Sequence, residues 1–387
     1  MGLCIEGGRV LTADGALTPA TVVVDDGIIA ALPSGGAGRM AGGPRIDAGG
    51  RLVLPGIVDI HGDAFERQIM PRPNVHFPLD VALHDTDRQL VANGITTAYH
   101  GVTLSWEPGL RGRDRFVELR DAFRRLAPDL AADTRLHLRF ETHNLDAADD
   151  VEACLAGGEV GLLAFNDHIA DIVDELSAGG RAAEQYADRT GRSVADLLAL
   201  ARAAVGRAAE VPDTLRRLAG SARRHGVAML SHDDTTPETR RFYHDLGCAI
   251  AEFPVTEAAA HAAHELGNPI VMGAPNVLRG GSHKRFITAT DFIRAGLCTV
   301  LASDYYYPAQ LHAAFKLAAD GVLPLPAAWA LVSTNAADAA GLADRGRLGP
   351  GQRADIVIVD DANPRLPRIM ATIIAGRVRY AAGIPRD

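Results

Sequence analysis

The sequence contains few cysteines and no long apolar run. Its four cysteines, among 387 residues, are Cys4, Cys154, Cys248 and Cys298, and no two of them have the Cys-x-x-Cys spacing of a metal or redox pair. We interpret them as small buried residues of a cytoplasmic protein, because a reducing compartment keeps thiols free. No apolar run approaches the roughly 20 residues of a membrane helix, so we expect no membrane association.

Positive charge is also scarce. The chain has 39 Lys and Arg residues against 48 Asp and Glu residues, which gives a net charge of −9. This balance argues against nucleic-acid binding, because that function needs a basic surface. The apolar content of 47% excludes a disordered chain, and the 40 glycines and 21 prolines exclude a coiled coil. The chain also lacks the Gly-x-Ser-x-Gly turn of serine hydrolases.

The two ends of the chain resemble each other in pattern and differ from the middle. Residues 1–55 and 346–387 contain short β-type runs bounded by turn residues, such as 21–24 and 372–378. We expect both ends to form one small β-sandwich-like domain. Two unrelated edge extensions are the alternative.

The middle of the chain, residues 56–345, alternates apolar runs with helical segments. Eight such units predict an α/β fold, a (β/α)8 TIM-type barrel. A doubly wound open sheet is the alternative, but its usual Gly-x-Gly-x-x-Gly turn is absent. Residues 171–212 interrupt the rhythm and predict a helical insertion, which is either a lid or an extra packing element. The eight runs are 56–60, 95–99, 135–140, 161–165, 227–231, 249–253, 269–273 and 299–303.

Imidazole and acidic side chains follow nearly every run. Catalytic groups of such barrels sit at the C-terminal ends of the strands. Buried groups of this kind cost free energy unless they are paired, hydrogen-bonded or bound to metal. We therefore interpret them as a cage for one or two divalent metal ions. The residues are His61, Asp63, His100, Glu141, His143, Asp167, His168, His232, Asp233, Asp234, Glu252 and Asp304.

The spacing of the first pair supports metal binding, whereas other positions have simpler explanations. His61 and Asp63 point to the same side of a strand, so both could bind one ion. His100 could instead be an ordinary strand-end histidine, and Asp233 and Asp234 could cap the next helix. Because no serine or cysteine nucleophile stands out, water activated by metal is the favoured nucleophile.

A basic segment with two adjacent glycines follows the seventh run. It spans residues 278–285 and contains Arg279, Lys284 and Arg285. Glycine lets backbone N–H groups approach an anion, while Arg and Lys supply charge. The segment therefore predicts an anionic substrate. A surface loop with solvated cations is the alternative.

Longer strings show a family resemblance. The whole chain resembles the amidohydrolase superfamily, through residues 54–61, 301–304 and 349–357. A narrower resemblance is to the phosphonate-catabolism diphosphatases, which cleave α-D-ribose 1-methylphosphonate 5-triphosphate to the 5-phosphate and pyrophosphate. The strings that carry it are 61–68, 71–73, 94–100, 253–256, 273–280 and 303–306.

The resemblance implies roles for matching positions. His61 and Asp63 match the metal pair of the first strand. No Lys follows the fourth run, so Glu141 takes the place of the bridging ligand. His232 and Asp304 match the ligands of the fifth and eighth strands.

Three departures keep a different substrate open. Glu252 stands where the superfamily has a histidine of the sixth strand. Residues 169–172 replace an expected Thr-Pro-Gly-Gln, and residues 284–286 replace a small residue and Gly.

These observations together predict a metal-dependent hydrolase of a ribose 5-triphosphate-type phosphoanhydride, with release of pyrophosphate. The alternative is a cyclic amide hydrolase or deaminase that acts on a small anionic heterocycle with the same metal site. We expect zinc, with manganese or iron as alternatives, and a small anionic substrate, and we leave a homo-oligomer open. The predicted metal ligands are His61, Asp63, Glu141, His168, His232 and Asp304, of which Asp304 is also catalytic. The predicted substrate-binding residues are His100, Asn276, Arg279, Ser282, His283, Lys284 and Arg285.

Overall fold

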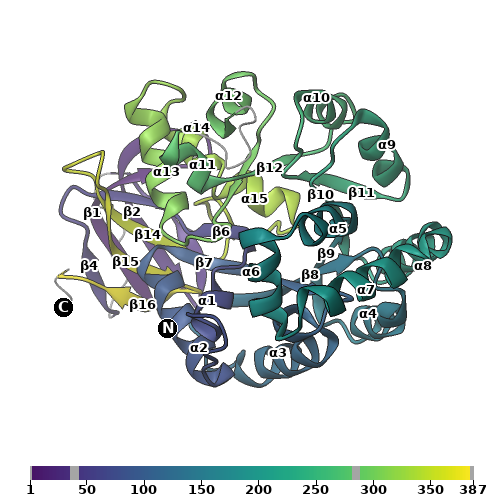
Figure 1. Ribbon diagram of the computed structural model, residues 1–387. Helices are drawn as coiled ribbons and strands as arrows, with labels where there is room; N and C mark the ends of the chain where they lie inside the picture. The colour runs from purple at the N-terminus through teal and green to yellow at the C-terminus, as the bar shows by residue number, and fades with distance from the viewer. Residues whose placement is uncertain (1, 35–42, 281–287, 384–387) are drawn as a thin grey trace.

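A parallel barrel forms the centre of the molecule. The computed structural model describes residues 2–34, 43–280 and 288–383. Eight parallel strands pair in chain order, and a bridge between Gly62 and Asp304 joins the last strand back to the first (Figure 1). The predicted barrel is thereby confirmed. The strands are β6 (Ile57–Gly62), β7 (Ile95–Leu104), β8 (Asp133–Glu141), β9 (Val160–Asn166), β10 (Ala228–His232), β11 (Cys248–Glu252), β12 (Ile270–Gly273) and β13 (Val300–Ala302).

Amphipathic helices cover the outside of the barrel. In α3 (Arg113–Leu126), for example, Phe116, Leu119 and Phe123 repeat at helical spacing and are buried, while arginines occupy the other face. None of the helices in the described ranges is long and apolar enough to cross a membrane. The other helices around the strands are α1 (Phe65–Ile69), α2 (Leu79–Ala92), α4 (Ala148–Ala156), α8 (Val211–Arg224), α9 (Pro237–Asp245), α10 (Glu257–Glu265), α11 (Ala274–Arg279), α12 (Ala289–Arg294), α13 (Ala309–Ala319), α14 (Leu325–Ala330) and α15 (Thr334–Ala339).

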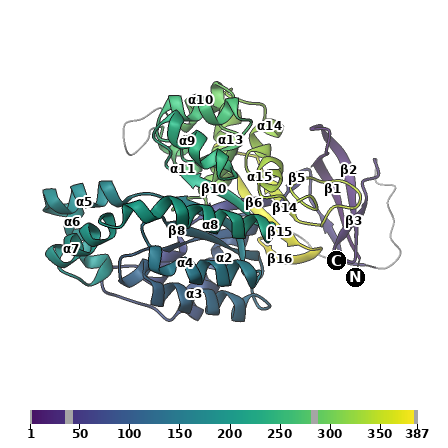
Figure 2. The same ribbon diagram turned by 90° about the vertical axis from the view of Figure 1, so that its right-hand side faces the viewer.

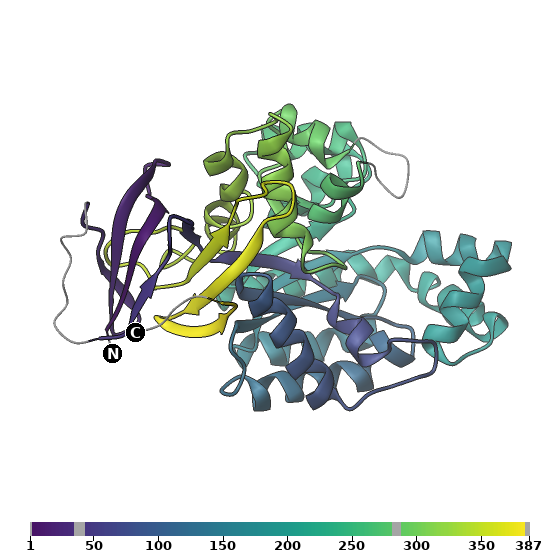
Figure 3. The same cartoon turned by 90° about the vertical axis from the view of Figure 1, so that its left-hand side faces the viewer.

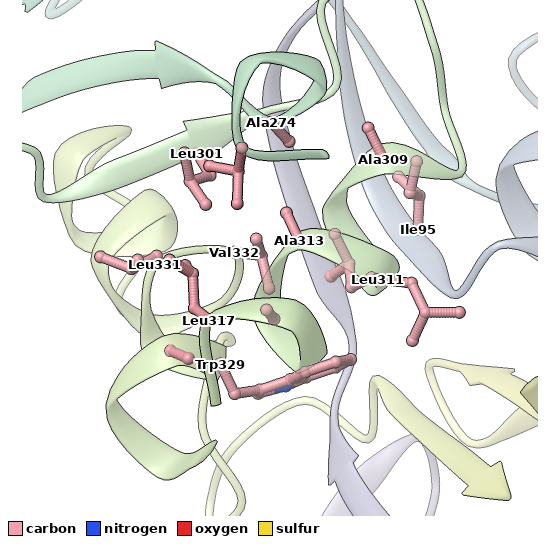
Figure 4. Packing of buried hydrophobic residues seen from close by; sticks show 14 of the residues in the cluster. Ile95, Ala274, Leu301, Ala309, Leu311, Ala313, Leu317, Trp329, Leu331 and Val332 are labelled. Carbon is pink, nitrogen blue, oxygen red and sulfur yellow. The ribbon is translucent and has the colours of Figure 1, made fainter. Parts of the chain in front are cut away.

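A dense apolar cluster fixes the last helices against the barrel. Trp329 is fully buried in this cluster, near Leu317 of α13 and Val332 (Figure 4). Its indole N–H donates to the carbonyl of Pro55 at 3.0 Å. The aromatic ring therefore joins the C-terminal helices to the point where the chain enters the barrel.

Three helices project beyond the barrel after β9. They are α5 (Ile169–Ala178), α6 (Gly180–Thr190) and α7 (Val194–Val205), and they extend away from the other helices (Figure 2). Ile172, Leu176 and Leu197 form a small core of their own, against which Trp106 packs. These three helices span residues 169–205, within and just before the predicted insertion at 171–212. The predicted domain boundaries at residues 55 and 345 stay a prediction.

Both ends of the chain contribute to a second sheet (Figure 3). Strand β14 pairs antiparallel with β5, which places Val357 opposite Leu54. This pairing joins the two termini in one sheet, so the second part of the predicted fold is also confirmed. Its strands are β1 (Leu3–Leu11), β2 (Leu17–Asp25), β3 (Ile28–Ala31), β4 (Arg45–Asp47), β5 (Leu52–Pro55), β14 (Ile356–Asp360), β15 (Arg368–Ile374) and β16 (Arg377–Ala381).

Candidate metal centre and substrate cavity

The first group of candidate ligands lies where the barrel closes. His61, Asp63 and Asp304 each offer one donor atom, and these three atoms lie within 4.8 Å of one another. The backbone holds the group, because Asp304 N donates to His61 O at 2.9 Å and Asp63 N donates to Asp304 O at 3.0 Å. The φ angle of Asp304 is 56°, a left-handed value that non-glycine residues rarely adopt and that tends to mark functional sites.

A second group lies on the neighbouring strand ends. Donor atoms of His168, His232 and Asp233 also lie within 4.8 Å of one another. Glu141 adjoins this group, with Oε1 2.7 Å from His168 Nδ1. Asp233 has a φ of 57° and does not cap the next helix, because Thr236 caps α9. The structure therefore brings the predicted ligands together in two groups.

Glu252 occupies the centre of the site and is fully buried. One carboxylate oxygen lies 2.8 Å from His61 Nδ1, and the other lies 2.7 Å from His232 Nδ1. The same carboxylate is 4.0 Å from Nδ1 of His137. Burial alone would raise the pKa of Glu252, but the surrounding imidazoles hold it well below its ordinary value. Glu252 therefore links residues of three strands.

Arg139 places a positive charge between the two groups. Its Nη1 lies 3.5 Å from Asp63 Oδ2, and its Nη2 lies 3.2 Å from His232 Nε2. The side chain is nearly buried, at 6% exposure. Sequence reasoning did not select Arg139 or His137. The signal was present, because His137, Arg139 and Glu141 alternate along β8 and so face one side of the strand.

The protonation of Asp304 is shifted by its surroundings. Burial and the nearby Asp63 carboxylate raise the pKa of Asp304 to about 7, while His61 and Arg139 oppose the rise.

The donor set fits divalent metal ions. Each group combines imidazole nitrogen with carboxylate oxygen, as zinc and related metals prefer. His61 and His232 both contact Glu252 through Nδ1, so Nε2 is the nitrogen that each ring could offer to a metal ion. In His232 this nitrogen also faces Arg139 Nη2 at 3.2 Å. A carboxylate that holds one ring nitrogen is the usual support of a metal-binding histidine.

The predicted substrate-binding residues lie in different surroundings. His100 is buried, stacks on Phe123 with ring centroids 4.9 Å apart, and meets the edge of Phe65. Burial lowers the pKa of His100 to about 3. Asn276 is half-buried in α11. Arg279 is exposed and donates to the hydroxyl of Tyr305 at 3.3 Å. Ser282, His283, Lys284 and Arg285 lie outside the described residues.

A cavity of about 320 Å³ opens beside the second ligand group. A larger hollow of about 720 Å³, between α1 and α2, contains none of the candidate ligands. We name the smaller one the insertion cavity, because α5 and α6 form one of its walls. Its lining residues are Thr103, Ser105, Glu107, Arg111, Arg139, Glu141, His168, Asp171, Ile172, Glu175, Tyr186, Arg189, His232 and Asp233.

Comparisons with known proteins agree with this architecture. The chain is 33% identical to alpha-D-ribose 1-methylphosphonate 5-triphosphate diphosphatase of Escherichia coli (strain K12), over 81% of this chain and 84% of the relative. It is 26% identical to adenine deaminase of Methylobacterium nodulans, over 98% of this chain but 60% of that protein.

Solved structures show the same fold at low sequence identity. A Xaa-Pro dipeptidase superposes with a TM-score of 0.70 at 14% identity, over 99% of this chain and 100% of that one. An N-isopropylammelide isopropylaminohydrolase from Burkholderia multivorans gives a TM-score of 0.65 at 19% identity, over 98% of both chains. The sequence profile of the amidohydrolase family matches residues 88–380. This chain therefore belongs to the amidohydrolase family and is a metal-dependent hydrolase.

Proposed function

We propose that the protein hydrolyses the phosphoanhydride of a ribose 5-triphosphate-type substrate and releases pyrophosphate. The observation that carries the proposal is the 33% identity to a diphosphatase of that substrate class, over most of both chains. The site supports it with carboxylate-rich ligand groups and with Arg139 between them. The substrate is small and anionic, as the sequence predicts.

The two ligand groups would hold one divalent ion each, and zinc is the proposed metal. His61, Asp63 and Asp304 would hold the first, and His168, His232 and Asp233 the second. Divalent ions in such a site supply the positive charge that activates water and polarises a phosphoryl group. Glu141, which was predicted as a ligand, is proposed to orient His168 through its Nδ1 contact.

The chain's own residues would bind the phosphates and move the proton. Asp304 would accept the proton of the attacking water through its carboxylate. It lies in the first ligand group with His61 and Asp63, so a water activated at this group would be within its reach. Arg139 would donate to a phosphoryl oxygen, since its two Nη atoms already face both ligand groups.

A second cationic group would hold the leaving pyrophosphate. Arg279 contacts the hydroxyl of Tyr305, and the guanidinium of Arg67 lies 5.5 Å from the centroid of the same ring. Both arginines thus lie beside Tyr305, which directly follows Asp304. Charge-assisted bonds from arginine are among the stronger contacts to phosphate. In the sequence, Arg279 belongs to the predicted basic segment, residues 278–285.

Parallel product assays test the proposal. The zinc-loaded protein is given ribose 5-triphosphate in one reaction and adenine or a cyclic amide in another, and pyrophosphate, ammonia and ring opening are measured. We expect pyrophosphate, with a loss of several orders of magnitude in the Asp304→Asn variant. Asp245→Asn, at an exposed position of α9, serves as the matched control and retains the rate.

The deaminase alternative rests on one finding, the 26% identity to adenine deaminase over nearly the whole chain. Ammonia or ring opening without pyrophosphate would replace the first proposal by this one and leave the metal site in place. A cytoplasmic location is also proposed, because the four cysteines are buried free thiols.

A further inference from the structure

We infer that the insertion cavity binds the sugar part of the substrate, while the polyphosphate lies on the opposite side of the metal centre. This inference rests on the proposed function and assigns to α5 and α6 a share in substrate specificity. It comes from the position of the cavity, its unpartnered polar atoms and its charges.

The position of the cavity places a bound group next to the reacting centre. Glu141, His168 and His232 border the cavity on its barrel side. Tyr186 and Arg189 of α6 border it on the outer side. A small organic group in this space would therefore contact the second ligand group and the insertion together. The volume of about 320 Å³ is at the lower end of small-molecule sites and suits a single sugar ring.

Two polar atoms of the wall lack partners. Thr103 is 4% exposed, and its hydroxyl has no hydrogen-bond partner within residues 2–34, 43–280 and 288–383. The same holds for Nε of Arg189 in these ranges. A buried polar group without a partner costs free energy, and such groups are rare unless a ligand or ion satisfies them. Both residues line the cavity, and a hydrogen-bonding ligand that reaches these buried atoms would satisfy them.

The charges of the wall disfavour a polyphosphate there. The lining includes five carboxylates and three guanidinium groups. Arg189 is already paired with Glu107 at 2.8 Å, and Arg111 is paired with Glu66 through bonds of 2.9 and 3.0 Å. Glu175 adds a carboxylate at the exposed rim. Carboxylates accept hydrogen bonds and repel phosphate, whereas sugar hydroxyls donate as well as accept.

The other side of the metal centre carries positively charged side chains. The cavity is built on the C-terminal ends of β7, β8 and β10 and on residues that follow β7, β9 and β10. Arg67, Arg279 and Tyr305 follow β6, β12 and β13. In the strand order β12 and β13 lie across the barrel from β8 and β9, and β6 adjoins β7 on one side and closes on Asp304 after β13 on the other. A substrate with a neutral sugar at one end and phosphates at the other matches this polarity. The bond to be cleaved then lies over the two ligand groups.

A hydroxyl deletion tests the inference. Thr103→Val keeps the shape of the side chain and removes its unpartnered hydroxyl, so we expect no loss of folding stability. For ribose 5-triphosphate we expect KM to rise by about three- to tenfold, the loss of one hydrogen bond. For inorganic tripolyphosphate, which has no sugar, we expect KM to stay unchanged. Thr372→Val is the matched control. The hydroxyl of Thr372, in β15 of the terminal sheet, donates to Val91 O of α2, so we expect the free energy of unfolding to fall and KM to stay constant.

A rim substitution provides a second, independent readout. Glu175→Gln removes an exposed carboxylate, so the fold is not at risk. We expect KM to rise for ribose 5-triphosphate and to stay constant or fall for tripolyphosphate. If the polyphosphate occupied the cavity instead, KM would fall for both substrates, and the inference would be wrong. An unchanged KM for ribose 5-triphosphate in both variants would also overturn it.

Binding without turnover separates this inference from the proposed function. Ribose 5-phosphate should raise the melting temperature of the wild-type protein, and less so that of Thr103→Val, whereas inorganic pyrophosphate should act equally on both. Absence of pyrophosphate release from ribose 5-triphosphate would reject the proposed function alone. Equal stabilisation of both proteins by ribose 5-phosphate would reject the sugar site.

Discussion

Carboxylates hold the imidazole rings of the site from one side. Glu252 contacts Nδ1 of both His61 and His232, and Glu141 contacts Nδ1 of His168. A ring whose Nδ1–H is held in this way keeps Nε2 as an acceptor, which is the form that binds metal. The three histidine rings, which come from different parts of the chain, thus each offer Nε2 as the nitrogen that could bind a metal ion. Glu252 is the residue on which two of the three depend.

Replacing Glu252 should therefore weaken metal binding. In Glu252→Gln the amide no longer favours one ring form in both histidines, so we expect the zinc affinity to fall by about 10- to 100-fold. Titration against a competing chelator measures this directly, with Asp245→Asn as the control that keeps wild-type affinity. Wild-type zinc affinity in Glu252→Gln would show that the carboxylate does not position the ligands.

His100 gives a pH dependence with a defined sign. Burial lowers its folded pKa to about 3, whereas the unfolded value is about 6.5. Between these values the unfolded chain binds a proton that the folded chain does not, so stability falls as pH drops below about 6.5. The expected loss at pH 5 is about 2 kcal/mol. His100→Leu should lose less stability between pH 7 and pH 5 in urea unfolding, and an equal loss in both proteins would mean that the ring is charged when folded.

At the scale of elements, α9 supports two strand ends that carry the site. Arg240 of α9 is fully buried and contacts Asp234 at 3.2 Å. It also donates to Ser231 Oγ at 2.6 Å and to Cys248 O at 2.6 Å. These bonds join the helix to β10 and β11, which end in His232 and Glu252. The helix therefore fixes the distance between these two side chains.

Removing one partner of the buried Arg240–Asp234 pair should lower the free energy of unfolding. Arg240→Met leaves Asp234 buried without its cation, and we expect a loss of about 3–5 kcal/mol in the free energy of unfolding. Urea unfolding measures it. The double variant Arg240→Met with Asp234→Leu should recover part of the loss, because both charges are gone. A loss below 1 kcal/mol in the single variant would contradict this role.

The sequence allowed the elements to be predicted better than their contacts. Each barrel strand is a short apolar run of its own. The β-type runs at both ends predicted one joint domain, and the pairing of Val357 with Leu54 confirms that the two ends share a sheet. Glu252 was recognised as a departure, but its contacts with His61 and His232 arise only when distant strands close into a barrel. Such contacts leave no local pattern.

At the scale of the whole molecule, one carboxylate links the barrel to the C-terminal segment. Asp133, the first residue of β8, contacts Arg345 at 2.5 Å and Arg353 at 2.9 Å. Nearby, Gly94 adopts a φ of 80° where the barrel meets the terminal sheet, and a side chain there would collide with Ile369. The barrel therefore meets the C-terminal segment through the ion pairs of Asp133 and meets β15 through the close approach at Gly94.

The ion pairs of Asp133 should make the free energy of unfolding depend on pH. Burial would raise the pKa of Asp133, but Arg135 and Arg345 outweigh it and hold the pKa below its ordinary value. The stabilisation is therefore present above the unfolded pKa of about 3.9 and is lost as pH falls through the folded value. Asp133→Asn should cost about 2 kcal/mol at pH 7, and the gap to wild type should narrow below pH 4. Unfolding curves at both pH values measure this, and a gap independent of pH would refute it.

The most direct test of the proposed reaction is phosphorus NMR of ribose 5-triphosphate with the zinc-loaded protein. We expect two products, ribose 5-phosphate and pyrophosphate, with no orthophosphate, and no reaction after the metal is removed by a chelator. Orthophosphate with ribose 5-diphosphate, unchanged substrate, or turnover that persists in the metal-free protein would contradict it.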